Sequence, residues 1–289
     1  MGAVGAVGKV VVDVVLTCER APAPDEHQNV QRLVTAGGAA ANVAAQLASR
    51  GHQAILAGWQ GDDEASRDVC AALAARGVTL RTVARDRAPV ATVLAWGGDR
   101  AFLVDQGTLR ARLEDVTDSW LDGMSIVHFN GFELLDYCWP DVLAQVARLA
   151  HRRGIMVSVD CPTASRIVAQ GAASFRRAVA QLQPDFVFAN ASEAATLDLL
   201  TGPLLGSTAV VVHSGTAPSA CRTPQARTWV PLETVVPNPE TTGCGDAFAA
   251  GFLHAWQQGE SGVAATLVAH RWASEQARVT GAQPPLRQN

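Results

Sequence analysis

The chain has 289 residues, of which 48% are hydrophobic and 17% are charged, a balance typical of a globular protein with a sizeable core. Its net charge of −4 and its scattered lysines and arginines provide no basic face for nucleic acid. We expect a cytoplasmic protein that does not span a membrane, because no signal peptide is visible, no apolar run is long enough to span, and the six cysteines form no CxxC pair.

Apolar, strand-like runs alternate with helical patterns along most of the chain. Strands are expected at 6–16, 53–59, 125–130, 155–160, 185–190 and 208–215, and helices at 39–51, 63–77, 138–154, near 171–182, at 191–200 and from 247 onward. Strands separated by helices indicate βαβ units. We therefore expect a three-layer α/β fold, with a mainly parallel central sheet and helices on both faces, in one domain over 1–289.

Two stretches interrupt this alternation. Residues 17–36 are polar and contain proline, and residues 88–104 form two β-rich runs joined by the sequence GGD. Neither stretch suits a crossover helix, so we expect a small β-sheet lid with segments at about 14–36 and 88–105. Trp96 and Phe102 lie in this lid, and the sequence leaves open whether they cover a ligand or only pack against the lid.

The stretch ETTGCGDAF, residues 240–248, places a carboxylate at the start of an apolar helix. Gly243, Cys244 and Gly245 precede Asp246, and such a turn directs backbone N–H groups toward a site suited to phosphate. Asp246 could accept the proton of an attacking hydroxyl there. Helix capping is the alternative, although a cap does not require these glycines. No histidine near in sequence activates Cys244, so we expect its backbone, and not its thiol, to take part.

Two further segments carry side chains suited to ligands. GGAAANVA, residues 37–44, combines Gly37 and Gly38, which allow close backbone approach, with Asn42, whose amide can bind a polyol. NASE places Asn190 and Glu193 after a strand, where ligands bind in open α/β sheets. These two residues could order a hydrated Mg²⁺, but a helix N-cap with glutamate at the third position describes them equally well.

In this order, the segments resemble those of the ribokinase-like (PfkB) carbohydrate kinases. TTGCGDAFAAGF is similar to the family's C-terminal signature, GGAAANVA to its N-terminal signature, and NASE to its N-x-x-E motif. VGKVVVD resembles the opening strand that ends near a substrate-binding aspartate. GWQGDDEASRDVCAALAARGV resembles the G-x-x-G-x-D segment with its helix, and VVVHSG resembles the strand beside the nucleotide. The resemblance spans residues 4–282.

The resemblance implies an ATP- and Mg²⁺-dependent kinase that phosphorylates a hydroxyl, expected to be primary, of a small sugar or sugar derivative. It implies that Asp246 is the catalytic base beside an anion hole formed by Gly243, Cys244 and Gly245. For the other ligands it implies Asp13, Gly37, Gly38 and Asn42 around the acceptor, Asn190, Ser214, Gly215 and Thr241 around the nucleotide, and Glu193 at Mg²⁺ through water. The lid edges would allow a homodimer.

The sequence leaves the acceptor and part of the cation chemistry open. Glu240 stands where the family usually has aspartate, which puts activation by a monovalent cation such as K⁺ in doubt. A nucleoside kinase of the same family is one alternative. A non-catalytic sugar- or nucleotide-binding protein is another, although the base and the anion hole are both intact. A dinucleotide-dependent oxidoreductase is excluded by the lack of GxGxxG after the first strand.

Overall fold

The computed structural model describes residues 2–97, 99–136, 138–206, 209–237 and 239–285. The strands are β1 Ala3–Lys9, β2 Val11–Thr17, β3 Gln31–Gly37, β4 Ala54–Gln60, β5 Val78–Ala84, β6 Val90–Trp96, β7 Asp99–Asp105, β8 Met124–Asn130, β9 Met156–Asp160, β10 Phe186–Asn190, β11 Ala209–Ser214, β12 Ala217–Arg222 and β13 Arg227–Val230. The helices are α1 Ala39–Ala48, α2 Glu64–Ala75, α3 Pro140–Arg152, α4 Ala164–Gln170, α5 Ala172–Gln181, α6 Ala191–Thr196, α7 Cys244–Gln257 and α8 Gly262–Gln276. Short 3₁₀ helices lie at Leu113–Asp115, Asp118–Leu121 and Glu133–Leu135.

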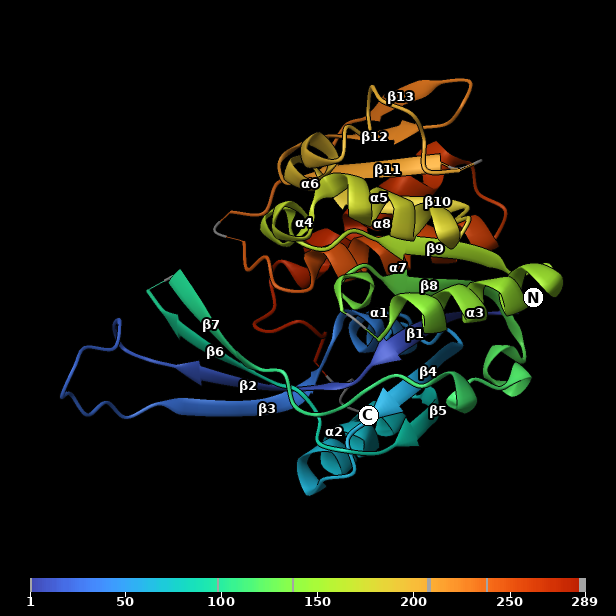
Figure 1. The fold of residues 1–289 in the computed structure, drawn as a ribbon. Helices are drawn as coiled ribbons and strands as arrows, with labels where there is room; N and C mark the ends of the chain where they lie inside the picture. The colour runs from blue at the N-terminus through green and yellow to red at the C-terminus, as the bar shows by residue number, and fades with distance from the viewer. Residues whose placement is uncertain (1, 98, 137, 207–208, 238, 286–289) are drawn as a thin grey trace.

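Nine strands form the main sheet, in the order β13-β12-β11-β10-β9-β8-β1-β4-β5 (Figure 1). The pairs from β5 through β11 are parallel, and within the described strands the antiparallel pairs of this sheet are those of β12 and β13. The expected three-layer fold with a mainly parallel sheet is thereby confirmed.

The central strands are apolar on both faces because helices cover both. In β1, Val4 and Ala6 pack with residues of α1, α2, α7 and α8, whereas Ala3 and Val7 pack with residues of α3 to α6. Successive side chains of a strand point to opposite faces, so a strand buried on both sides carries no polar alternation. Figure 1 shows α3 to α6 in front of the sheet and α1, α7 and α8 behind it.

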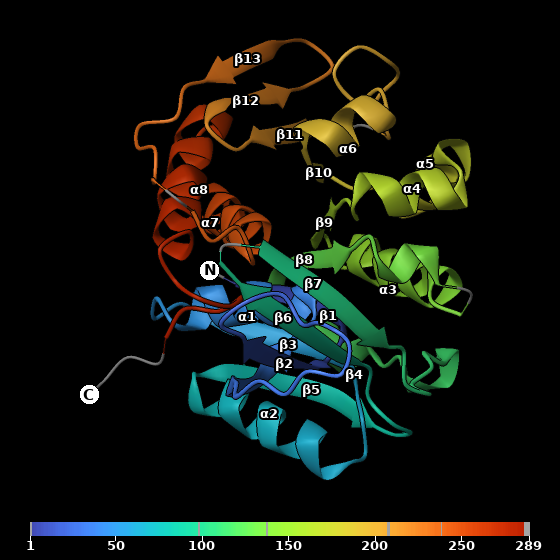
Figure 2. The same cartoon turned by 90° about the vertical axis from the view of Figure 1, so that its left-hand side faces the viewer.

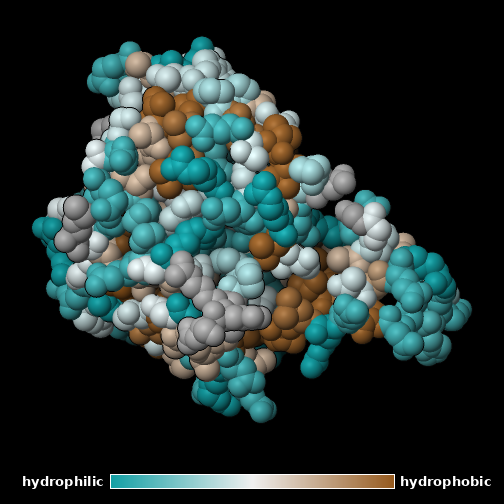
Figure 3. Space-filling model, turned by 180° about the vertical axis from the view of Figure 1, so that it is seen from behind, coloured by the Kyte–Doolittle hydropathy of each residue, from teal (hydrophilic) through white to brown (hydrophobic). Residues whose placement is uncertain are grey.

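Four strands form the separate small sheet, in the order β3-β2-β6-β7, which projects from the body as a lid (Figures 1 and 2). β2 pairs antiparallel with β3 and parallel with β6, and β6 pairs antiparallel with β7. The far end of the lid is hydrophilic, whereas apolar residues gather around its base (Figure 3). Residue 98 of the expected GGD turn lies outside the described residues.

The strand predicted over 6–16 is divided in two, and on this point the prediction was wrong. β1 belongs to the main sheet and β2 to the lid, so the first lid strand begins at Val11. Val10 joins them: its side chain is fully buried, and its N–H donates to the carbonyl of Trp59 in β4 at 2.8 Å. One continuous apolar run therefore contributes strands to two sheets. The hydrophobic pattern alone does not show where the first strand ends and the second begins.

Among the described residues, no helix combines the length and the apolar character needed to cross a bilayer. All six cysteines are free thiols.

Candidate active site

Two predicted site residues, Asn190 and Ser214, lie at one edge of the main sheet beside two polar residues that were not predicted. Asn130, Asp160, Asn190 and Ser214 are the last residues of β8, β9, β10 and β11. Because these strands are parallel, they all end at the same edge, where ligands bind in open α/β sheets. The first turns of α1 and α7 also reach this edge, since Asn42 and Asp246 are in contact there.

Asp246 lies in the first turn of α7, but Gly243 and not Asp246 is the N-cap residue. Asp246 Oδ2 accepts a hydrogen bond from Asn42 Nδ2 at 2.9 Å. Burial raises the pKa of Asp246 to about 7, the hydrogen bond from Asn42 opposes this rise, and the charges of Asp13 and Glu133 add to it. The side chain thus points across to α1, with a proton affinity close to neutrality.

The fold requires glycine at only one of the two glycine positions before Asp246. Gly243 has φ +75°, and a Cβ there would lie 2.3 Å from the carbonyl oxygen of Ala282, so the fold itself requires glycine. At Gly245 a Cβ would meet its nearest neighbour, His213 Nε2, at 3.8 Å, which is an ordinary contact. The fold does not require glycine at 245.

Cys244 faces away from the space beside Gly245. Its amide donates to the carbonyl of Thr241 at 3.3 Å, and its thiol lies 3.4 Å from the carbonyl oxygen of Glu240 and 3.6 Å from that of Ala273 in α8. Burial, followed by the charges of Glu240 and Asp246, raises the pKa of the thiol to about 11. The thiol is therefore protonated at neutral pH. The Cys244 N–H, which was expected in the anion hole, is already bonded to Thr241, so the N–H groups left for an anion in this turn are those that follow it.

The residues expected around the acceptor lie at the junction of lid and body. A Cβ on Gly37 would lie 2.1 Å from the carboxyl carbon of Asp13, so glycine makes room for that carboxylate. Gly38 is the N-cap of α1, with φ +87°, and a Cβ there would meet the carbonyl oxygen of Lys9 at 2.6 Å. Burial raises the pKa of Asp13 to about 7. Both glycines thus bring Asp13 and Asn42 to the same place.

Glu133 is a further site residue that the sequence did not reveal. It follows β8, is 3% exposed, and its Oε2 has no hydrogen-bond partner among the described residues. Burial raises the pKa of Glu133, its charge reaches Asp246, and the charge of Lys9 opposes the rise. A single glutamate after a strand forms no motif, so no sequence signal marks it. A buried, unpaired carboxylate oxygen suits a ligand hydroxyl.

Asn190 and Glu193 form the capping box of α6. Glu193 accepts from the Asn190 amide N–H at 2.8 Å and from Asn190 Nδ2 at 2.6 Å, while Asn190 Oδ1 accepts from the Glu193 N–H at 2.9 Å. Burial raises the pKa of Glu193 to about 7. Asp160, at the end of β9, was also missed by sequence reasoning, and burial and then the charges of Glu193 and Asp246 raise its pKa well above the usual range.

Ser214 and the residue before it face opposite sides of the sheet. Ser214 lines a cavity of about 190 Å³ together with Ala191 and Ala194 of α6 and Trp229 of β13. His213 faces the space at Gly245, and burial lowers its pKa to about 4, which leaves it neutral at physiological pH. Gly215 follows in the turn to β12, with φ +54°.

The lid contacts the start of α7 through one arginine. Arg100 of β7 donates to Glu240 at 2.5 Å, to Thr242 Oγ1 at 2.6 Å and to Thr241 Oγ1 at 2.5 Å. Glu240 also accepts from the Thr242 amide at 2.9 Å. Glu240 stands where the family usually has aspartate, and its carboxylate is thus already engaged in hydrogen bonds and in an ion pair with the lid.

The strand register places the two lid aromatics on opposite faces. Residues paired across strands share a face. Asp13 pairs with Ala91 of β6, and alternate residues of β6 on that face pair with Phe102 and Arg100 of β7. Trp96 lies on the other face. Phe102 is 54% exposed. Phe102 therefore faces the site and Trp96 does not.

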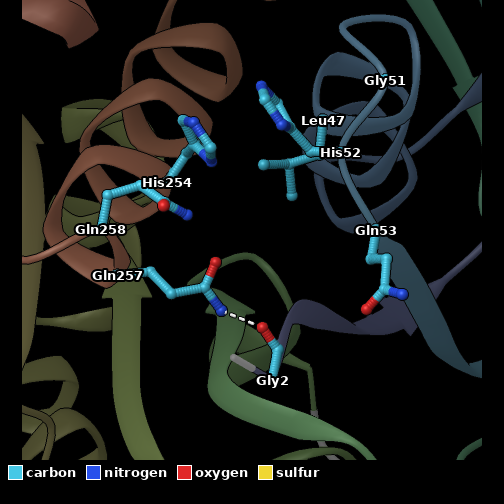
Figure 4. A pocket seen from close by; sticks show the side chains of 8 residues that line it. All are labelled: Gly2, Leu47, Gly51, His52, Gln53, His254, Gln257 and Gln258. Atoms are coloured by element: carbon cyan, nitrogen blue, oxygen red, sulfur yellow. Dashed lines mark hydrogen bonds between the residues drawn. The ribbon is translucent and has the colours of Figure 1, made fainter.

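A cavity of about 210 Å³ lies far from these residues (Figure 4). Its lining comes from the end of α7, the last turn of α1 with the loop that follows it, and the residue before β1: His254, Gln257, Gln258, Leu47, Gly51, His52, Gln53 and Gly2. Asn42 and Asp246 belong to the opposite ends of the same two helices. This cavity is therefore separate from the site at the strand ends.

The chain matches the pfkB family carbohydrate kinase over residues 1–289. The chain belongs to the PfkB family of carbohydrate kinases. It is 32% identical over 263 residues to an ATP-dependent ribose-1-phosphate kinase of Halopiger xanaduensis, covering 86% of this chain and 83% of that protein.

Solved structures of the family share the fold. Adenosine kinase from Sinorhizobium meliloti aligns with a TM-score of 0.84 at 21% identity, covering 98% of this chain and 96% of that one. A putative ribokinase II from E. coli, in complex with ATP and Mg²⁺, aligns with a TM-score of 0.83 at 18% identity, covering 98% and 94%. The protein is thus an ATP-dependent carbohydrate kinase, and its acceptor is the open question.

Proposed function

We propose that this PfkB-family kinase transfers the γ-phosphoryl group of ATP to a primary hydroxyl of a small sugar or sugar derivative, with Asp246 as the general base. The observation that supports this most strongly is the 2.9 Å contact between Asn42 Nδ2 and Asp246 Oδ2. It joins an amide suited to acceptor hydroxyls to a carboxylate suited to take their proton. A pKa of about 7 matches a base to neutral pH.

In this mechanism, Asp13, Asn42 and Glu133 hold the acceptor hydroxyls. Asp246 takes the proton of the attacking hydroxyl at the oxygen that Asn42 does not occupy. The new bond from that hydroxyl oxygen to phosphorus forms as the bond between phosphorus and the leaving ADP oxygen breaks. The N–H groups of the first turn of α7 face the moving charge, and Gly245 leaves room for it. The lid excludes water, which would otherwise compete as acceptor.

The residues present fit ATP and Mg²⁺. Mg²⁺, when bound, neutralises charge on the phosphates. Both oxygens of Glu193 already accept hydrogen bonds from Asn190, so this carboxylate would hold the ion through water. Asn190, Ser214, Gly215 and Thr241 would lie along the nucleotide. Asn190 and Ser214 end the neighbouring strands β10 and β11, Gly215 follows Ser214, and Thr241 precedes α7.

A sugar phosphate is the acceptor that we place first. The relative from Halopiger xanaduensis is a ribose-1-phosphate kinase. Arg100 lies on the lid face that carries Asp13, where it would exchange its ion pair with Glu240 for one with the phosphate of the acceptor. A nucleoside is the second candidate, because the exposed ring of Phe102 lies on that same face and could stack on a base.

A screen of D-ribose, ribose-1-phosphate and adenosine with ATP and Mg²⁺ tests the function. We expect the fastest turnover with ribose-1-phosphate. Fastest turnover with adenosine would select the nucleoside alternative. Tight ATP binding without phosphorylation of any sugar, sugar phosphate or nucleoside would instead favour the non-catalytic binding protein and overturn the proposal.

We propose further that the lid supports a homodimer and that K⁺ is not required. Leu33, Phe102 and Leu103 are large exposed apolar residues of the lid, and β7 is an edge strand. A monomer in sedimentation at micromolar concentration would contradict the dimer. Because Glu240 already accepts hydrogen bonds from Arg100 and Thr242, we expect the kinase activity to change little when K⁺ is replaced by Na⁺. Strong and selective activation by K⁺ would contradict this expectation.

A further inference from the structure

The segment that follows α8 returns to the active site and ends a chain of hydrogen bonds there. Gln283 is 6% exposed. Its Nε2 donates to the carbonyl oxygen of Ala36 at 2.8 Å and to Asn42 Oδ1 at 3.1 Å. Asn42 Nδ2 in turn donates to Asp246 Oδ2 at 2.9 Å. Three segments that are far apart in sequence therefore meet around one amide.

The two ends of this chain of hydrogen bonds fix which atom donates and which accepts in each bond. The carbonyl of Ala36 and an ionised Asp246 can only accept hydrogen bonds, whereas the amides of Asn42 and Gln283 can each be turned over to exchange donor and acceptor. The carbonyl of Ala36 requires Nε2 of Gln283 on its side. Nε2 then requires Oδ1 of Asn42, and this leaves Nδ2 of Asn42 to donate to the carboxylate of Asp246.

We infer that Gln283 is a positioning residue for the catalytic base. It holds Asn42 in the one amide orientation that donates to Asp246 and leaves the second oxygen of that carboxylate free for the acceptor hydroxyl. This inference rests on the proposed role of Asp246 as base. Without the donor at 283, the Asn42 amide can turn over and present its oxygen to the carboxylate, an arrangement that only a protonated Asp246 satisfies.

Other acidic groups lie around Asp246 and favour its protonated form. The charges of Asp13 in the lid and Glu133 after β8 raise the pKa of Asp246. Asp160 at the end of β9 also lies near, and burial raises its own pKa well above the usual range. The hydrogen bond from Asn42 acts against burial and these charges, because it lowers the pKa of Asp246. Burial is the largest cause of the raised pKa, and the orientation of this single amide sets how far that rise is offset.

Two variants test the inference. Gln283→Met keeps the approximate shape of the side chain and removes the donor, and Gln283→Glu replaces the donor by an acceptor. The matched control is Gln46→Met, because Gln46 is fully buried and donates to Gln276 Oε1 at 2.7 Å, a bond that does not involve Asn42. Titration of the Asp246 carboxyl carbon by ¹³C NMR, assigned through Asp246→Asn, reads the ionisation without any acceptor.

We expect the midpoint of Asp246 to rise by about one pH unit in Gln283→Met and further in Gln283→Glu. The acid limb of kcat/KM for ribose-1-phosphate, or for the screened acceptor that turns over fastest, should move with it. Gln46→Met should lower Tm and leave both midpoints in place. Where Gln283→Glu does not fold, Gln283→Met alone decides.

The outcomes separate the two proposals. Unchanged Asp246 midpoints in a folded Gln283→Met would overturn the inference and reduce Gln283 to an anchor of the C-terminal segment. That result would leave the base assignment intact as long as Asp246→Asn is inactive. Full activity of Asp246→Asn would instead overturn the proposed base and the inference together.

Discussion

At the scale of single residues, the signature glycines can be separated by what the fold requires of each. Gly243→Ala forces a left-handed backbone, which costs about 1–2 kcal/mol, and its Cβ would meet Ala282. Gly245→Ala meets no close neighbour. We therefore expect Gly243→Ala to lower Tm by several degrees. Gly245→Ala should melt near the wild-type temperature and lose kcat on the order of 100-fold, because its methyl group occupies the phosphoryl space.

Differential scanning calorimetry and steady-state kinetics on the two alanine variants check this contrast. Equal loss of stability in both variants, with kcat retained in folded Gly245→Ala, would show that Gly245 is also structural.

The ionisation of Asp246 also predicts how stability depends on pH. Its pKa in the folded protein, about 7, lies above the ordinary aspartate value of 3.8. The folded state therefore binds the proton more tightly, and the stability that this gives is lost as the pH rises through 7. We expect Asp246→Asn, which cannot ionise, to gain stability relative to wild type as the pH rises from 5 to 8. Urea unfolding at both pH values measures this difference, and a gap that does not change with pH would contradict the raised pKa.

At the scale of secondary-structure elements, the contact of β7 with the start of α7 predicts how the lid works. Arg100→Met removes the hydrogen bonds to Glu240, Thr241 and Thr242. Because this ion pair is about one third exposed and partly screened, we expect a rise of about three- to tenfold in the acceptor KM. ATP hydrolysis without acceptor should also increase, since a loosened lid admits water.

Arg32→Met is the matched control for the lid. Arg32 pairs with Leu16 across β2 and β3 and so lies on the face opposite Asp13. It should leave the acceptor KM and the hydrolysis rate unchanged. Equal effects of the two variants would show that the lid responds to charge in general and not to the contact with α7.

The same scale shows how much of the fold the sequence predicts. The parallel core was predictable because strands buried on both faces form continuous apolar runs, as in Phe186–Asn190. β12 and β13 were not predicted, because an antiparallel edge pair with exposed residues such as Trp229 carries no such run. α5 was predicted near 171–182, but α4 was missed because the helical pattern breaks at Gly171, where φ is +91°.

At the scale of the whole molecule, the sequence located the parts of the site that lie within motifs. Asp246, Asn42 and Asp13 each belong to a recognisable segment, and the structure brings them together. Glu133 and Gln283 were missed because each is a single polar residue whose role depends on distant neighbours. Gln283 lies 241 positions from Asn42, and no local pattern encodes such a contact.

The turnover of Asp246→Asn tests the central claim most directly. We expect a folded protein that still binds ATP and loses on the order of 10²–10⁴ in kcat, because asparagine cannot accept the proton. Asp141→Asn is the matched control, since Asp141 occupies the first turn of α3 as Asp246 does in α7, but is exposed. It should change kcat little. A folded Asp246→Asn with near-normal kcat and a Tm several degrees lower would contradict the account and leave Asp246 with a structural role.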